Sequence, residues 1–294
     1  MPHLMNARLT VMAWLVIAVS LTSVPIPSAA QASSYVVTDL GVLGGIESKA
    51  FDINDSARVV GESTITAEPT FTRPFVWETG TMTDLANFGG STGAAFSVNR
   101  CGLAVGAADT ATGESHPFIW SAIVGKTNLG TLAGGSFAIA LDINNANQVV
   151  GQSEIGGPGV LQDRAFVWDV TNGMRAIATL GGSSNAARAI NDRGQIVGFS
   201  TTTSGETHAF LLSKGTLINI PTLGGRIGVA NEINNLGQVV GFSTLSVGSL
   251  NPPFHAFLRD PGADPLDLGT LGGNFSIAFD INDATEIVGT SEVT

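Results

Sequence analysis

Cysteine and charged residues are both scarce in this chain of 294 residues. The single cysteine, Cys101, excludes an intramolecular disulfide framework and a structural zinc site built on cysteines. Charged residues make up 13% of the chain, and only 13 residues are basic, scattered without a patch, which excludes the usual kind of nucleic-acid binder. Low charge combined with 44% hydrophobic residues also excludes intrinsic disorder. The chain is acidic, with a net charge of −11.

Long apolar runs are absent except near the N-terminus. Arg8 is followed by an apolar run from Val11 to Val19, and small residues at Ala30 and Ala32 fit a cleavage site. This order of a positive charge, an apolar run and small residues is typical of a secretory signal peptide, here residues 1–32. No later stretch is long enough to span a bilayer. We therefore expect a secreted, extracellular or periplasmic protein.

Glycine is abundant, at 37 residues, and it marks a repeat. Gly-Gly pairs recur at 44–45, 89–90, 134–135, 181–182, 224–225 and 272–273, at spacings of 43 to 48 residues. Alanine follows each pair by five positions, at Ala50, Ala95, Ala140, Ala187, Ala230 and Ala278. Asparagine follows each pair by nine positions, at Asn54, Asn99, Asn144, Asn191, Asn234 and Asn282. Such fixed offsets predict an array of six repeats.

Five of the repeats also hold a block centred on phenylalanine, such as Pro-Phe-Val-Trp77 and Ala-Phe-Val-Trp168. Two blocks read His208-Ala209-Phe210 and His255-Ala256-Phe257. With the neighbouring Asp-Leu-Gly-Thr-Leu-Gly-Gly273, these motifs make residues 35–294 resemble the bacterial extracellular HAF-repeat proteins. The resemblance implies an exported repeat protein and no established reaction.

The residue pattern of one repeat predicts strands throughout. Between Asn191 and Gln195 a short turn separates two apolar segments, and Gly194 suits the left-handed position of such a hairpin. Ala57 and Thr285 occupy the same position and should be the strained copies. The phenylalanine block predicts a third strand and the segment after it a fourth. Four short strands in each unit of this length are typical of a propeller blade.

We therefore predict an all-β, six-bladed β-propeller as a single domain over residues 33–294, with an open β-repeat stack or solenoid as the alternative. The sixth repeat lacks a phenylalanine block. A strand over residues Tyr35 to Leu40 could complete that blade and close the ring.

The repeated alanines and asparagines are interpreted as structural positions. The alanines suit the crowded strand nearest the axis, and the asparagines cap the hairpins through bonds to the backbone. Two positions before the asparagine stand four acidic residues, Asp52, Asp142, Glu232 and Asp280, which could form an acidic rim that concentrates cations. Calcium needs six to eight oxygen ligands, and most copies lack them, so we assign no metal site, no cofactor and no catalytic residue.

Two functions stay open at this point. The first is a non-catalytic binding or scaffold module for a protein or glycan, with no nucleic-acid partner and no membrane span in the mature chain. The second is a propeller-type hydrolase or lyase acting on extracellular polysaccharide. An enzyme is the less favoured of the two, because an active site breaks repeat symmetry with unique residues, and this sequence is strictly repetitive.

Overall fold

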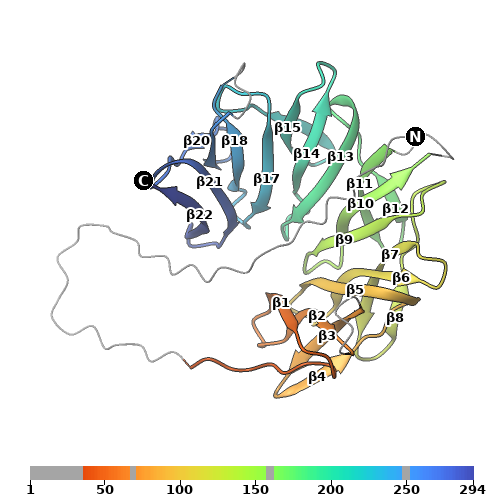
Figure 1. The fold of residues 1–294 in the computed structure, drawn as a ribbon. Helices are drawn as coiled ribbons and strands as arrows, with labels where there is room; N and C mark the ends of the chain where they lie inside the picture. The colour runs from red at the N-terminus through yellow and green to blue at the C-terminus, as the bar shows by residue number, and fades with distance from the viewer. Residues whose placement is uncertain (1–35, 67–70, 157–161, 247–251) are drawn as a thin grey trace, which may run out of the picture.

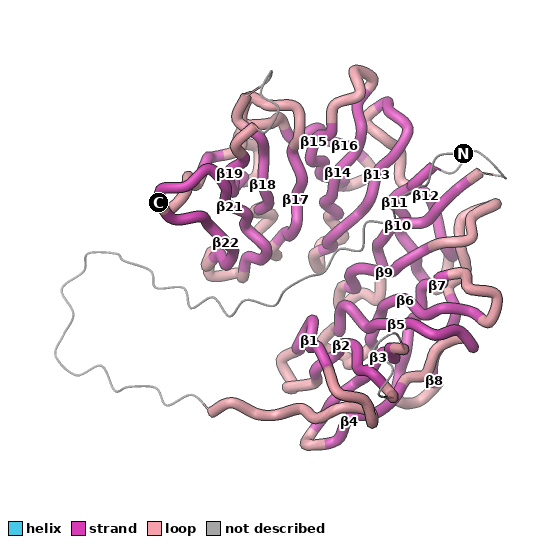
Figure 2. Tube along the Cα trace, in the orientation of Figure 1, coloured by secondary structure: helices cyan, strands magenta, loops and turns pink. Residues whose placement is uncertain are grey.

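The computed structural model describes residues 36–66, 71–156, 162–246 and 252–294, and the predicted signal peptide lies outside them. The described chain consists of strands, turns and loops (Figure 2). The predicted all-β class is confirmed. No helix in the described ranges is long and apolar enough to cross a membrane.

The strands follow the predicted order within each repeat. First strands are β1 (Ser48–Ile53), β5 (Gly89–Val98), β9 (Ala138–Ile143), β13 (Gly181–Ile190), β17 (Gly228–Ile233) and β21 (Gly272–Ile281). Second strands are β2 (Val59–Thr64), β6 (Ala104–Thr110), β10 (Val149–Ile155), β14 (Ile196–Thr202), β18 (Val239–Thr244) and β22 (Ile287–Val293). Third strands are β3 (Thr72–Glu78), β7 (Ser115–Ser121), β11 (Gln162–Asp169), β15 (Thr207–Ser213) and β19 (Phe254–Arg259). Fourth strands are β4 (Thr81–Asp84), β8 (Gly125–Asn128), β12 (Gly173–Ala176), β16 (Thr216–Ile220) and β20 (Leu266–Asp267).

The prediction of six blades is wrong. The four strands of each of the first five repeats pair antiparallel in chain order, and the five sheets are arranged as a five-blade β-propeller (Figure 1). The sixth repeat supplies only the β21–β22 hairpin, which joins the fifth sheet through one parallel bridge between Phe254 and Phe275. The physical reason is the missing phenylalanine block: without a third strand there is nothing for a fourth strand to pair with.

The predicted closing strand at residues Tyr35 to Leu40 is also wrong. Residues 36–47 form no strand, and Tyr35 lies outside the described part. The segment lies against the first sheet: Leu43 N donates to Ser63 Oγ at 2.9 Å, and Gly45 N donates to the Thr64 carbonyl at 3.0 Å. These bonds hold the N-terminal segment on β2. It adds no strand to the last repeat.

A β-bulge recurs in all six repeats. In every repeat the pairing register between the first and second strands shifts directly after the repeated alanine, as between Ala187 and Ala189 in the fourth repeat. A bulge bends its strand and re-aims the side chains that follow it. Each bulged strand therefore turns the residues after the alanine toward the axis.

The repeated glycine of the second strand is required by this bulge. Gly198 pairs with Ala187, and a Cβ on Gly198 would lie 2.0 Å from the Ala186 carbonyl oxygen. The equivalent glycines of the other repeats meet the same carbonyl at 1.9 to 2.0 Å. The Val-Gly pair of the sequence thus marks the place where two backbones approach too closely for a side chain.

The hydrophobic core lies between neighbouring sheets. Val150 of β10 packs against Ala187, Ile190 and Phe210 of the next blade, and the same arrangement recurs along the propeller. The third-strand phenylalanines are fully buried: Phe75, Phe118, Phe166, Phe210 and Phe257. Burying a phenylalanine contributes about 2 kcal/mol each, so these contacts are a major source of stability.

The hairpin turns have the predicted backbone. The expected left-handed residue has positive φ in every repeat: Ala57, Gly102, Asn147, Gly194, Gly237 and Thr285, with φ from 60° to 88°. Ala57 and Thr285 hold this conformation with a Cβ, at a cost of about 1 kcal/mol or more each.

The bulge predicts a strong effect of one added methyl group. Gly198→Ala forces the methyl against the Ala186 carbonyl, and we expect the free energy of unfolding to fall by about 3 kcal/mol. Gly228→Ala is the matched control, because a Cβ there meets its neighbours at ordinary distances of 3.4 to 3.8 Å. Urea denaturation of the two variants measures the difference. Equal stability of both would contradict the close approach.

Candidate ligand-binding cavity on the propeller axis

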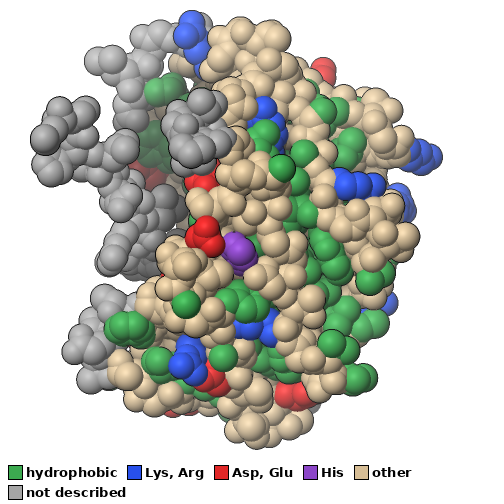
Figure 3. Space-filling model, turned by 90° about the vertical axis from the view of Figure 1, so that its right-hand side faces the viewer, with side chains coloured by type: hydrophobic (Ala, Val, Ile, Leu, Met, Phe, Trp, Pro, Cys, Tyr) green, Lys and Arg blue, Asp and Glu red, His purple; other side chains and the backbone are tan. Residues whose placement is uncertain are grey.

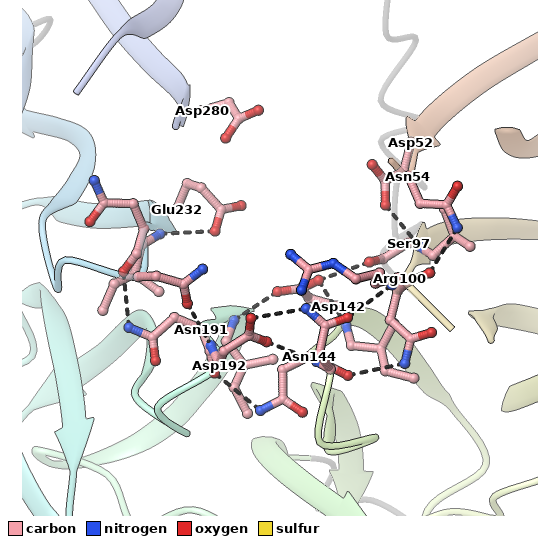
Figure 4. Close-up of a pocket in the computed structure, with 18 of the residues that line it drawn as sticks. Asp52, Asn54, Ser97, Arg100, Asp142, Asn144, Asn191, Asp192, Glu232 and Asp280 are labelled. Atoms are coloured by element: carbon pink, nitrogen blue, oxygen red, sulfur yellow. Dashed lines mark hydrogen bonds between the residues drawn. The ribbon is translucent and has the colours of Figure 1, made fainter. Parts of the chain in front are cut away.

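A cavity of about 560 Å³ lies where the first strands of the six repeats converge. Each first strand contacts the next one, so these strands are the innermost of their sheets. The lining comes from the ends of the first strands and from the turns that follow them. Figure 4 shows lining residues of this cavity, with ten of them labelled.

The acidic residues of the predicted rim all line this one cavity: Asp52, Asp142, Glu232 and Asp280. They occupy the position directly after the bulged residue, which explains why strands so far apart in the sequence aim them at the same space (Figure 4). Ser97 has the equivalent position in the second repeat and also lines the cavity. The lining holds seven acidic and two basic side chains, so the cavity is strongly acidic.

Asp142 joins three blades. Its Oδ1 accepts bonds from Ile143 N at 2.7 Å and Ser97 Oγ at 2.8 Å, and its Oδ2 accepts one from Ile190 N at 2.7 Å. These donors come from the third, second and fourth repeats. Both oxygens are therefore held by the scaffold.

Asp52 makes a similar connection at the first blade. Its Oδ1 accepts from Ile53 N at 2.7 Å and its Oδ2 from Val98 N of the next blade at 2.8 Å. Glu232 and Asp280 differ, since each accepts a bond from only the following amide, Ile233 N and Ile281 N. Each of these two carboxylates keeps one oxygen without a hydrogen-bond partner among the described residues.

The carboxyl groups affect one another through the cavity. Burial raises the pKa of Glu232 well above its ordinary value of 4.5, and the charges of Asp142, Asp280 and Asp52 raise it further. Burial also raises the pKa of Asp142 and of Asp52, although their backbone hydrogen bonds act in the opposite direction. The cavity therefore holds carboxyl groups that resist ionisation together.

The repeated asparagines form a chain of hydrogen bonds around the cavity. In every repeat the asparagine Oδ1 accepts a bond from the amide four residues later, at 2.9 to 3.0 Å, which closes its own hairpin. Its Nδ2 donates to the carbonyl of the next asparagine, at 2.9 to 3.1 Å, from Asn54 through Asn234. Asn282 ends the chain, and its Nδ2 donates to Glu286 of its own turn. The predicted capping bonds are therefore present, and the bonds between blades are additional.

The residue after each asparagine forms a second chain. Asn145 N donates to Asp192 Oδ1, and Asp192 N donates to Asn235 Oδ1, both at 2.9 Å. Asn235 N in turn donates to Asp283 Oδ1 at 2.7 Å. At the other end Arg100 forms an exposed ion pair with Asp55 at 3.1 Å. The two chains together fix the turns that border the cavity.

Arg188 is a cavity residue that the repeat analysis missed. It stands at the bulged position, where the other repeats have Phe51, Phe96, Leu141, Asn231 and Phe279. Its Nη1 donates to Asn231 Oδ1 at 3.0 Å, its guanidinium lies 5.6 Å from the Phe199 ring centre, and burial lowers its pKa. The signal in the sequence was a single charged residue at a position otherwise apolar or neutral.

Other candidate chemical groups lie away from the cavity. His116, His208 and His255 bond the fourth strand of their own blades, at Asn128, Asn219 and Asp267. Ser91 lies in a Gly-x-Ser-x-Gly stretch, but inside β5, whereas a serine nucleophile needs a strand-to-helix turn. Among the described residues no group of three His, Cys, Asp or Glu side chains is placed to hold a metal ion.

Comparisons with known proteins assign no activity to this chain. A family model described as "Protein of unknown function (DUF3466)" matches residues 91–216. No curated protein matches the chain.

Three similar solved structures have low sequence identity. TolB from Acinetobacter baumannii has 16% identity, a TM-score of 0.49 and coverage of 72% of this chain. This chain spans about half of the TolB chain, 51%. The gluconolactonase XC5397 from Xanthomonas campestris has 12% identity, a TM-score of 0.41 and coverage of 80% of each chain. A triple arginine-to-alanine mutant of AofleA from Arthrobotrys oligospora has 10% identity and a TM-score of 0.40, over 84% of this chain and 73% of the other.

The asparagine chain predicts a difference between two equivalent residues. Asn191→Ala removes the hairpin cap and the bond to the Asn234 carbonyl at a buried site, so we expect a loss of about 3 kcal/mol in stability. Asn282→Ala is the control: it is exposed, and its amide makes no bond to another blade, so we expect a loss of about 1 kcal/mol. Thermal unfolding of both variants tests this order, and the reverse order would refute the role of the bonds between blades.

The raised pKa values predict that stability depends on pH. A carboxyl whose pKa is higher in the folded protein than in the unfolded chain binds its proton more tightly when folded. The free energy of unfolding then falls as the pH rises from about 4.5 through the folded pKa of Glu232. Glu232→Gln should flatten this fall, and the exposed Glu292→Gln should not. Urea denaturation across a pH series gives both slopes, and identical slopes would argue against the coupled cavity.

Proposed function

We propose that this protein is an exported, non-catalytic binding module that holds a glycan in the axial cavity. The observation that carries the proposal is the convergence of six repeats on one polar, acidic cavity of about 560 Å³. The predicted signal peptide and the resemblance to HAF-repeat proteins support export.

The lining chemistry favours a glycan over a protein. Carboxylate and amide oxygens accept hydrogen bonds from sugar hydroxyls, and the Arg188 guanidinium donates them. The rings of Phe51 and Phe96 lie at one side of the lining, 5.6 Å apart, and aromatic faces pack well on the apolar face of a sugar ring. A protein partner would more often meet an apolar patch with a polar rim.

The outer surface supports the same choice of site. On the face seen in Figure 3, charged side chains are scattered among apolar and uncharged groups. The cavity, in contrast, collects seven acidic side chains. A polar ligand therefore finds its densest set of acceptors on the axis.

The bonding of the carboxylates argues against catalysis. Both oxygens of Asp52 and of Asp142 accept hydrogen bonds from their own or neighbouring blades, which leaves these carboxylates poorly suited to move protons. The best candidate acid is Glu232, which has a raised pKa and one oxygen without a partner among the described residues. A hydrolase or lyase acting on extracellular polysaccharide, with Glu232 as general acid, is the second candidate on this observation.

A glycan array together with a polysaccharide hydrolysis screen tests both candidates on the chain without its signal peptide. We expect glycan binding without turnover. Arg188→Ala should weaken binding about ten-fold through the loss of a charged donor in the cavity lining, and Arg226→Ala, an exposed arginine outside the cavity, should not. Turnover that Glu232→Gln abolishes would replace the binding proposal with the enzyme. Binding unchanged by Arg188→Ala would place the ligand elsewhere.

A further inference from the structure

The second strand of the last repeat, β22, has an unpaired edge among the described residues. Within the described chain β22 pairs with β21 alone, whereas every other second strand also pairs with a third strand. We propose that this edge accepts an extended segment with the sequence Ala-Phe or Pro-Phe followed by Val, Ile or Leu, in antiparallel pairing. The proposal concerns a second binding surface, separate from the axial cavity.

The pairing of second and third strands is the same in all five complete blades. The glycine of the second strand lies directly opposite the phenylalanine of the third: Gly61–Phe75, Gly106–Phe118, Gly151–Phe166, Gly198–Phe210 and Gly241–Phe257. In the first and third of these pairs an added Cβ would meet the phenylalanine ring at 2.9 to 3.0 Å. The glycine therefore leaves room for the ring. In the last repeat Gly289 has no such partner.

The hydrophobic cluster beside β22 lacks an aromatic ring. Four clusters between neighbouring sheets each contain one third-strand phenylalanine. The fifth cluster, formed by Val240, Ala256, Ala278 and Ile281, contains none. The apolar residues that would surround a third-strand phenylalanine are thus present beside β22.

The residues of β22 that face this cluster are only half-buried. Ile287, Gly289 and Ser291 are partly exposed, whereas their equivalents Ile196, Gly198 and Ser200 are buried. In the complete blade, His208 lies opposite Ser200 and Leu212 opposite Ile196. A third strand added at β22 would bury Ile287, Gly289 and Ser291 in the same way.

The chemistry of the occupant follows from the five third strands of this chain, since they show what the site accepts. In each, phenylalanine follows Ala or Pro and precedes Val, Ile or Leu. A folded second copy has no such strand to donate, because all five of these phenylalanines are fully buried in their own blades. Residues 36–47 are held on β2. The occupant is therefore an extended segment that is free to add its backbone to the edge.

A labelled peptide tests the proposal. The peptide copies residues 205–215, Gly-Glu-Thr-His-Ala-Phe-Leu-Leu-Ser-Lys-Gly, and is titrated with the chain without its signal peptide while fluorescence anisotropy is recorded. We expect saturable binding with one peptide per chain. Hydrogen exchange should show new protection confined to the amides of residues 287–293.

The matched peptides distinguish strand addition from non-specific hydrophobic binding. Phe210→Ala in the peptide should weaken binding roughly ten- to a hundred-fold, because the ring no longer fills the fifth cluster. Thr207→Ala, at the end of the strand, should change it little. Absence of binding, equal binding of the Phe210→Ala peptide or of a scrambled peptide, or protection elsewhere would overturn the proposal. Self-association that protects residues 287–293 without peptide would also overturn it, by assigning the edge to a second copy.

Discussion

The amide side chain of one asparagine per repeat is the interaction on which the propeller depends. Its oxygen closes the hairpin of its own blade, and its nitrogen bonds the backbone of the next blade, from Asn54 to Asn234. Local turn geometry and the spacing of blades are therefore set by the same residue. No other side chain combines a donor and an acceptor at this length with a tolerance for turn backbone.

The β-bulge makes the axial cavity acidic. Because the register shifts directly after the repeated alanine, the following side chain is directed to the axis, and in four repeats that side chain is acidic. Burial raises the pKa values of Asp52, Asp142 and Glu232, and the charges of neighbouring acidic residues raise them further, which opposes stability above the ordinary pKa range. Asp142 offsets part of this cost with three hydrogen bonds to three blades. The same carboxylate thus lines the cavity and holds neighbouring blades together.

Much of the local structure was predictable from the sequence, because it depends on residues close together in the chain. The hairpins, the left-handed turn residues and the four-strand order followed from fixed offsets of glycine, alanine and asparagine. The blade count was not predictable from the number of repeats, since a blade needs a third strand and the last repeat has no phenylalanine block. The bulge and the bonds between blades arise from pairing register and from repeats 43 to 48 residues apart, which no local pattern encodes. Arg188 was not predictable from the repeat pattern, because it is the one residue that differs in charge at a position where the other repeats have apolar or neutral side chains.

The asparagine chain runs in one direction, since each amide from Asn54 through Asn234 donates to the following repeat and accepts nothing from it in return. Each of the first five repeats consequently offers the same amide donor to the repeat after it, and each repeat after the first offers the same carbonyl acceptor to the repeat before it. Duplicating or deleting a whole unit would therefore leave this type of asparagine bond available at every remaining junction. Expansion and contraction of the repeat array can thus proceed without a new kind of hydrogen bond at this position.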